Sequence, residues 1–536
     1  MAAETYDAII VGGGHNGLVT GFYLARAGLS TLILERRPFV GGACNTEEFA
    51  PGFRASTGAY VLSMLREAIW SDMRLAQRGI VVDPAGPTLN LFPDGAHYSL
   101  CDDMAANVEE TKRFSAADAA ALPLFERDLA EMVQSVIPSF NWTAPDPRLR
   151  SLTDLRELAR WGRVGFRQRK RLADLAFLFS TSATQLLSER FESEHVKAAL
   201  GWHAINDSVA GPSTPGTAYV LLHDHASEEA EGGVRQWGFV RGGMGRLTAV
   251  MADAAREAGC TIRCGADVAR VRTSGGRAIG VRLADGEEIR GRCVLSNADP
   301  KRTFLTLCDR GDLPSEFVAR IEAYRCMGTS IKMNLALSEL PYAKGFPADG
   351  VQPYHTGIME LNPFIPEMDF QQAQAVQGIP ADPAHIELCF PTVHDPSLAP
   401  EGKHIVTIDV NSQPYRLREG SWDEIKEDRA DRVIATIAEY FPKLPDLIEH
   451  RQVVTPLDME RLMGLTGGHA LHGDMAPDQL LFLRPTRGWA NYRTPIRNLY
   501  LCGAGTHPGG GVSGANGRNA AREVLRDARR QRGARR

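Results

Sequence analysis

The chain has 536 residues, too many for one hydrophobic core, so two or more domains are expected. Its net charge of −5 gives no general attraction to nucleic acid, and no apolar run is long enough to span a bilayer. The nine cysteines include no C-x-x-C pair, which argues against chemistry by a cysteine pair and favours a reducing, cytoplasmic setting. No metal-ligand spacing is present, so no metal site is expected.

A nucleotide-binding pattern lies close to the amino terminus. Asp7–Val11 is a short apolar run typical of a buried parallel strand. Gly12, Gly14 and Gly17 follow with the spacing G-x-G-x-x-G, and residues 18–27 then read as a helix. The helix amino terminus would face a pyrophosphate, and the residues between the last two glycines share this turn. Those residues, expected to bind the cofactor as well, are His15 and Asn16.

An acidic residue completes the pattern. Residues 30–34 form a second strand pattern, and Glu35 follows it, near the offset at which a carboxylate meets a ribose diol. Arg36 comes next and is expected to meet phosphate charge or to remain solvated. Gly41 and Gly42 would let a loop run close beneath a bound cofactor. The first 42 residues therefore predict a dinucleotide site.

Residues from about 70 to 230 are mainly helical in pattern, and one stretch among them is unusually basic. The segment 148–171 carries nine arginines and lysines against Asp154 and Glu157, interleaved with leucines, Trp161 and Phe166. Such a basic amphipathic helix can lie on an anionic membrane surface. Alternatively, it is a solvated face over an internal apolar stripe.

A second block of nucleotide-domain pattern begins near residue 232. A helix is expected over 246–258, followed by strands over 261–263, 268–272, 278–283, 288–292 and 294–298. This block resembles the second half of a nucleotide-binding fold that returns to its first half. It contains no second G-x-G-x-x-G, so one dinucleotide is expected.

Two further polar features lie between residues 301 and 490. Residues 329–337 alternate as a strand, and Lys332 stands on its polar face, where it must meet water, a carboxylate or a ligand. Residues 467–479 concentrate histidines and aspartates within an apolar region. This second stretch is either a structural turn or a functional loop.

The carboxyl end carries a glycine-rich loop between a strand and a helix. Residues 499–502 form the strand, 503–517 hold the glycines, and 518–530 form the helix. So many glycines indicate backbone pressed against a flat ligand, with a helix amino terminus aimed at it. Since a helix dipole stabilises reduced isoalloxazine, FAD is the expected dinucleotide. His507, in this loop, is a candidate catalytic residue.

Six motifs in order resemble those of the phytoene desaturase-like flavoproteins, and the flavin-type β-carotene ketolases are also similar. The motifs are V-G-G-G-H-N-G-L-V, E-R-R-x-x-x-G-G-A, G-G-M-G-x-L, V-L-S-N, D-Q-L-L-F-L-R-P and G-A-G-T-H-P-G-G-G-V-S-G. The resemblance implies an α/β Rossmann-like FAD-binding domain of the amine oxidase and phytoene desaturase type, and a discontinuous α+β substrate domain. The FAD domain would comprise 1–69, 232–300 and 491–536, and the substrate domain 70–231 and 301–490.

The resemblance also implies roles for individual residues. The three glycines of the first turn would hold the pyrophosphate, and Glu35 the adenosine ribose. Val268 would contact the adenine through its backbone, and Lys332 would bond a water at flavin N5. The residues expected along the flavin are Gly505, Val512 and Ser513.

The expected activity is an FAD-dependent oxidoreductase that moves hydride from an apolar substrate, isoprenoid or lipid-like, to the flavin. Carotenoid-type relatives load such substrates from a membrane, which would suit the segment 148–171. The alternatives are oxidation of an amine and an FAD-binding interaction protein with little turnover. No nucleic-acid partner is expected.

Overall fold

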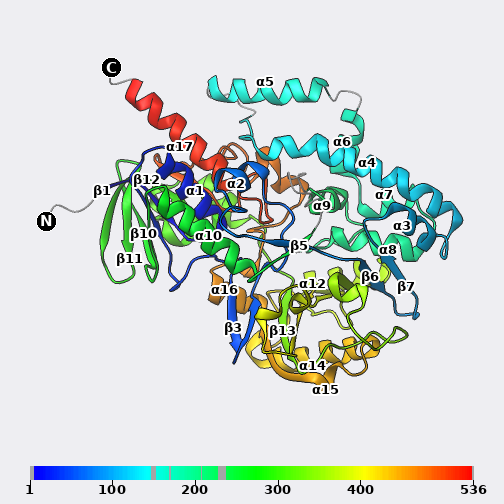
Figure 1. Cartoon of the computed structure of the whole chain (residues 1–536). Coiled ribbons are helices and arrows are strands. Elements are labelled where there is room, and N and C mark those ends of the chain that lie inside the picture. The colour runs from blue at the N-terminus through cyan, green and yellow to red at the C-terminus, as the bar shows by residue number, and fades with distance from the viewer. Residues whose placement is uncertain (1–4, 147–151, 168–170, 207, 227–236, 534–536) are drawn as a thin grey trace.

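The computed structural model describes residues 5–146, 152–167, 171–206, 208–226 and 237–533. In these ranges the chain builds two large mixed sheets, each covered by helices (Figure 1). The first sheet lies at the left of the view, beside α1 and α10. The second sheet lies toward the lower right, above α14 and α15. The α/β architecture expected from the sequence is confirmed.

The first sheet is assembled from three distant parts of the chain. Its central strands are parallel, and β18 pairs with β12 beside the main path. Two antiparallel strands extend the sheet beyond β12. In order, the strands are β10 (Val268–Ser274), β11 (Arg277–Leu283), β12 (Glu288–Ser296), β1 (Thr5–Val11), β2 (Thr31–Leu34) and β9 (Cys260–Arg263), with β18 (Leu499–Leu501) on β12.

One strand differs from the sequence expectation. Residues 288–292 and 294–298 were expected as two strands, but they form the single strand β12. Its first part pairs with β11, and its later part pairs with β1 and β18. The strand therefore continues through Cys293 without a break. The carboxyl ends of the parallel strands consequently meet at one edge of the sheet, where α/β folds bind ligands.

Three helices cover one face of this sheet: α1 (His15–Arg26), α10 (Met244–Glu257) and α17 (Ala515–Gly533). They share an apolar core that includes Leu18, Val250 and Val524. The other face packs against residues beyond the domain boundary suggested at 300, among them Phe304 and Phe317 of the segment that ends in α11 (Ser315–Glu322).

The second sheet is mostly antiparallel. Its strands in order are β17 (Ile448–Val454), β13 (Ile331–Leu337), β16 (His404–Val410), β15 (Ile386–Cys389), β14 (Ile358–Leu361), β6 (Thr88–Leu91) and β7 (His97–Leu100). One face buries Met333, Leu335 and Ile408 against α14 (Trp422–Tyr440). Every residue of β13 is buried, so its polar side chains point into the protein rather than to solvent.

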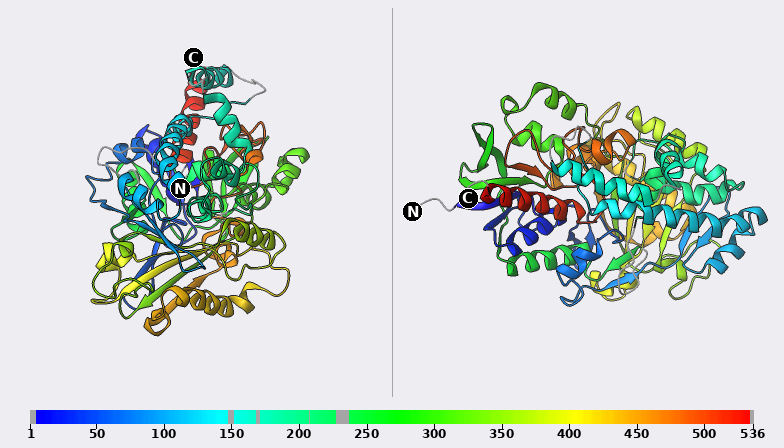
Figure 2. Two further views of the ribbon diagram at one scale, coloured as in Figure 1. Left: turned by 90° about the vertical axis from the view of Figure 1, so that its right-hand side faces the viewer. Right: turned by 90° about the horizontal axis from the view of Figure 1, so that it is seen from above.

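A group of helices forms the third part of the molecule, and most of them share an apolar core with β7. Its members are α3 (Met104–Thr111), α4 (Ala116–Phe140), α5 (Leu152–Arg167), α6 (Leu172–Ser180), α7 (Ala183–Ser188), α8 (Glu194–Gly201) and α9 (Thr217–Asp224). Helix α5 lies at the outer edge, far from the second sheet, in both Figure 1 and the left view of Figure 2. In the part of the chain that the structure describes, no helix has the length and apolarity needed to cross a membrane.

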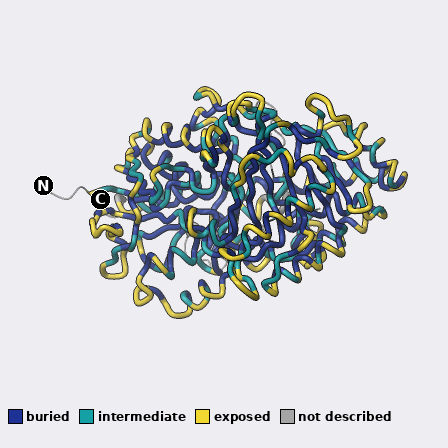
Figure 3. The backbone as a smooth tube through the Cα atoms, turned by 90° about the horizontal axis from the view of Figure 1, so that it is seen from below, coloured by how far each residue is buried: buried dark blue, intermediate teal, exposed yellow. Residues whose placement is uncertain are grey.

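Shorter elements connect these parts. Two small antiparallel pairs are β3 (Thr46–Ala50) with β4 (Phe53–Ser56), and β5 (Val82–Pro84) with β8 (Gly238–Val240). The remaining helices are α2 (Glu67–Asp72), α12 (Ile365–Val376), α13 (Pro391–His394), α15 (Leu444–Leu447) and α16 (Pro456–Met463). Figure 3 shows the buried segments running through the interior, with the exposed turns at the rim.

Candidate functional site

One large cavity lies between the two sheets. Its volume is about 320 Å³, and its wall joins the carboxyl edge of the first sheet to the polar face of the second. The predicted residues that line it are Gly12, Gly14, His15, Asn16, Glu35, Arg36, Gly41, Gly42, Val268, Lys332 and Val512. Candidates from opposite ends of the sequence are therefore brought to one site.

The turn between β1 and α1 is packed too closely for side chains. A Cβ on Gly17 would lie 2.2 Å from the carbonyl oxygen of Gly12, and a Cβ on Gly14 would lie 2.9 Å from Asn297 Nδ2. Gly42 crosses directly beneath Gly14, with its Cβ position 3.3 Å from the Gly14 Cα. This bare backbone forms a cradle at a helix amino terminus, which suits a pyrophosphate. Gly17 itself packs the helix and does not line the cavity.

Glu35 is held rigidly at the next strand end. The peptide N–H of Gly13 donates to its Oε2 over 2.7 Å, and the N–H of Arg37 donates to its Oε1 over 2.9 Å. The side chain is 6% exposed and borders the cavity, so the carboxylate retains lone pairs for a ribose diol. Val268, at the start of β10, lines the same cavity.

Arg36 has a different principal contact from the one expected. Its Nη2 donates to the carbonyl oxygens of Arg461 and Leu462, over 3.0 Å and 2.7 Å, at the end of α16. Burial, followed by the nearby charge of Arg302, lowers the pKa of Arg36. The guanidinium thus fastens α16 against the cavity rim, and the rim also includes Arg302.

The glycine-rich loop before α17 forms the other end of the cofactor site. Gly511 and Val512 line the cavity, whereas Gly505 and Ser513 do not. Gly505 packs on Pro300, since a Cβ there would lie 2.4 Å from its Cδ. Ser513 Oγ accepts from the N–H of Ala515, the first residue of α17. These two residues shape the loop rather than its cavity surface.

His507 does not reach the cavity. Its Nε2 lies 2.8 Å from the Ser139 carbonyl oxygen, and its ring lies 5.8 Å from that of Trp161. Burial lowers the pKa of His507 to about 4, so the imidazole is neutral at neutral pH. His507 therefore connects the loop to α4 and packs near Trp161 of α5, and its expected catalytic role stays a prediction.

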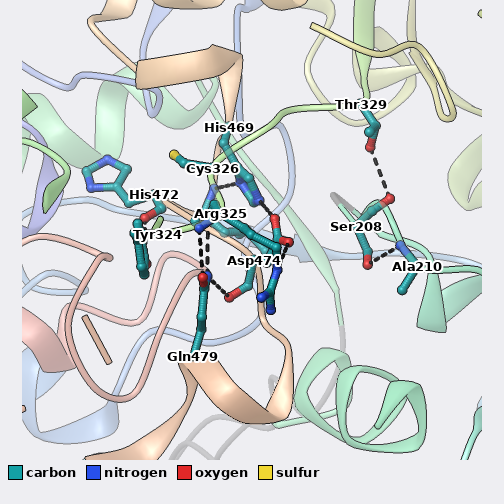
Figure 4. A network of polar contacts seen from close by, with 12 residues as sticks. Ser208, Ala210, Tyr324, Arg325, Cys326, Thr329, His469, His472, Asp474 and Gln479 are labelled. Carbon is teal, nitrogen blue, oxygen red and sulfur yellow. Dashed lines mark hydrogen bonds and ion pairs between the residues drawn. The ribbon is translucent and has the colours of Figure 1, made fainter. Parts of the chain in front are cut away.

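The polar stretch 467–479 forms a loop that is held by its own polar contacts, as the structural alternative expected. His469 pairs with Asp474 over 3.2 Å, and Asp474 meets Arg325 Nε over 3.1 Å, while Tyr324 donates to the carbonyl oxygen of His472 over 2.9 Å (Figure 4). This network explains most of the polar residues as supports of the loop. His472 itself lines the cavity.

Three imidazoles border the cavity: His223 is buried, and His15 and His472 are half-buried. Burial is the main cause that lowers the pKa of each to about 4, so all three are neutral at neutral pH. In the described residues, no hydrogen-bond partner is found for His15 Nε2 or for the Asn16 side-chain oxygen. Together with the glycine cradle, these groups fit a bound dinucleotide.

The far end of the cavity lies on the second sheet. Lys332 is 1% exposed, and its Nζ lies 3.9 Å from Asp409 Oδ2 and 3.0 Å from the centre of the Tyr60 ring. The expectation that Lys332 meets a carboxylate is confirmed. Sequence reasoning missed Tyr60, Asp224, Glu387 and Asp409, which also line the cavity, because only the tertiary fold brings them together.

A strand–turn–helix cradle with an acidic ribose site, facing a second glycine-rich loop across one cavity, defines an FAD-binding oxidoreductase. The family model described as "Flavin containing amine oxidoreductase" matches residues 17–525, so the chain belongs to this family. It is an FAD-dependent oxidoreductase, as the sequence predicted.

The chain is 39% identical over 551 residues to "Pyridine nucleotide-disulfide oxidoreductase domain-containing protein 2" of Mus musculus, covering 97% of this chain and 94% of that protein. It is 28% identical to one of the subunits of limonene dehydrogenase from Castellaniella defragrans, again covering 97% and 94%. A crystal structure of an oxidoreductase from Methanosarcina mazei has a TM-score of 0.60 at 15% identity, covering 97% and 99%. That last likeness concerns the fold alone.

Proposed function

We propose that the protein oxidises an apolar substrate, isoprenoid or lipid-like, by removing hydride from one of its carbons. The observation that carries the proposal is that one cavity extends from the cofactor cradle to a mainly apolar wall. Beyond the cofactor cradle it is lined by Tyr60, Val61, Met64, Val220, Trp237 and Leu471. The similarity to a limonene dehydrogenase supports an apolar substrate.

When bound, FAD supplies the hydride acceptor at flavin N5. The chain itself would bind and orient the reactants. Glu35 would accept hydrogen bonds from the ribose hydroxyls, and the first turn of α1 would face the pyrophosphate. The apolar wall would exclude water from the reacting carbon, and Lys332 would hold a water or proton near the flavin.

Anaerobic bleaching of the flavin tests this proposal. Isoprenoids, fatty acyl compounds and amines are mixed in turn with the FAD-loaded protein, and the loss of oxidised-flavin absorbance is followed. Bleaching by an isoprenoid or acyl compound is expected. The family description favours amines as the second candidate, and bleaching by amines alone would establish that reaction instead. A flavin that no compound reduces would favour an interaction protein.

We also propose that helix α5 delivers such a substrate by contacting an anionic membrane. In α5 the acidic Asp154 and Glu157 are buried, whereas Leu155 is 52% and Leu158 41% exposed. Of the basic segment 148–171, residues 148–151 and 168–170 and the side chains of residues 152–153 and 164–167 lie outside the described part. The exposed leucines argue against an internal apolar stripe at these two positions.

A further inference from the structure

Four ionisable side chains form one row across the second sheet. Lys332 on β13 pairs directly with Asp409 on β16, Asp409 with Glu387 on β15, and Glu387 with Glu360 on β14. Directly paired residues place their side chains on the same face of a sheet. The first three line the cavity, and the opposite face is the apolar surface against α14.

Glu387 combines a place on the cavity wall with a buried oxygen that lacks a hydrogen-bond partner in the described part of the chain. Its side chain is 4% exposed, and no hydrogen-bond partner for its Oε1 is found within the described ranges. A buried carboxyl oxygen left without a partner is costly, so a polar ligand atom in the cavity would stabilise it. Burial, assisted by the charge of Asp409, raises the pKa of Glu387 well above its usual value. This shift favours the protonated form of the side chain, and a protonated carboxyl group can both donate and accept a hydrogen bond.

The same region disfavours a cationic substrate group. The aromatic face of Tyr60 would be a natural seat for a substrate ammonium, but the Lys332 ammonium already lies 3.0 Å from the ring centre. A second cation placed there would be repelled by Lys332 at short range. The Asp409 carboxylate is already paired with Lys332, with 3.9 Å between Lys332 Nζ and Asp409 Oδ2.

The remaining wall at this end is largely apolar, with Val61, Met64 and Trp237 among its members. We propose that the substrate is an apolar molecule with one uncharged oxygen group, a hydroxyl or a carbonyl, and that this group binds Glu387. The inference rests on the proposed function, because it names the polar end of the substrate proposed there.

Four probes with the same ten-carbon chain test the inference: 1-decanol, 2-decanone, decylamine and decanoate. Each is titrated into the FAD-loaded protein, and dissociation constants are taken from perturbation of the flavin spectrum and from the shift in melting temperature. The two neutral probes should bind about tenfold more tightly than decylamine or decanoate. The Glu387→Leu variant should weaken binding of the neutral probes about five- to tenfold, as expected for one lost hydrogen bond.

Three further variants sharpen the result. Glu387→Gln keeps a donor and an acceptor, so it should retain the preference for neutral probes even if Glu387→Leu fails to fold. Glu360→Leu is the matched control, since Glu360 lies in the same row, is fully buried and does not line the cavity. Lys332→Met should tighten binding of decylamine, because it removes the ammonium from the Tyr60 ring.

Tighter binding of decylamine than of 1-decanol to the wild-type protein would overturn the inference and leave the apolar substrate proposal standing. Equal losses in Glu387→Leu and Glu360→Leu for every probe would also overturn it. Failure of all four probes to bind a protein that retains its FAD would contradict the inference and the apolar substrate proposal together.

Discussion

Glu35 performs a structural task and is expected to bind the cofactor as well. One of its oxygens accepts a hydrogen bond from the N–H of Gly13, which fixes the turn between β1 and α1. The same side chain also borders the cavity. The spacing of Glu35 from the glycines was visible in the sequence, but this contact with the turn was not. It couples the shape of the pyrophosphate cradle to the ribose site.

Replacing Glu35 with alanine should therefore lower the affinity for FAD by about tenfold or more. The variant loses the acceptor for the Gly13 N–H and also the acceptor expected for the ribose hydroxyls. The bound FAD per protein after gel filtration measures the effect. Glu47→Ala is the control, since Glu47 pairs with Arg37 over 2.6 Å but does not line the cavity. Equal loss of FAD from both variants would show that the Glu35 contact is only structural.

Lys332 is expected to matter for turnover rather than for cofactor retention. The Lys332→Met variant should keep its bound FAD and slow reoxidation of the reduced flavin by oxygen about tenfold or more, because a buried positive charge is removed. Stopped-flow absorbance follows the reoxidation. Lys426→Met removes a lysine that pairs with Asp458 outside the cavity, and its rate should equal that of the wild type. An unchanged rate in Lys332→Met would assign the lysine to folding alone.

At the scale of elements, the two helices at the cofactor site come into unusually close contact. Gly517 on α17 faces α1, and a Cβ there would lie 2.2 Å from the Asn16 carbonyl oxygen. The glycine-rich pattern of the sequence predicted a ligand for this region, and this position serves helix packing instead. The two ends of the chain thus meet through backbone, which positions both helix amino termini at one cavity.

The Gly517→Ala variant should separate α1 from α17 and destabilise the fold by about 1–3 kcal/mol, as overpacking does. Its FAD content and melting temperature should both fall. Gly162→Ala is a matched helical control, because no atom lies within 4 Å of its Cβ position in α5. A Gly517→Ala protein with normal melting temperature and FAD content would contradict the packing argument.

Helix α5 is the element for which membrane contact is predicted. Arg156 and Arg163 are exposed, and each basic residue near an anionic surface contributes about 1 kcal/mol that fades with salt. Wild-type protein should sediment with anionic liposomes at low salt and only weakly with neutral ones. The double change of Arg156 and Arg163 to glutamate should weaken this binding at least about tenfold while the flavin spectrum stays unchanged.

Two comparisons control the liposome experiment. Changing the exposed Arg416 and Arg418 to glutamate alters the net charge equally but lies on the segment before α14, so binding should be kept. Changing Leu155 and Leu158 to serine should weaken binding as well, because apolar burial contributes to it. If all three variants bind as the wild type does, α5 is a solvated face.

For the whole molecule, local patterns predicted the nucleotide-binding sheet well. The strand, glycine turn and helix at residues 5–26 depend on nearby residues, and so does the helix that begins after the last glycine-rich loop. The row from Lys332 to Glu360 was not predictable, because it depends on the register of four strands separated by long connections. The position of the His507 side chain was not predictable either, because its motif resembles a cofactor loop, whereas the ring contacts the Ser139 carbonyl oxygen.

Because the cavity is shared by both sheets, bound FAD should stabilise the whole molecule rather than one domain. Ligand at a concentration 100 times its dissociation constant contributes about 2.7 kcal/mol. Protein stripped of flavin should melt at a lower temperature and regain its stability with FAD. FMN lacks the adenosine half, which is expected to reach Glu35 and Val268, so FMN should restore little stability. Calorimetry measures both additions, and flavin released by heat should be identified as FAD. Equal recovery with FMN would show that the adenosine end of the cavity contributes nothing to binding.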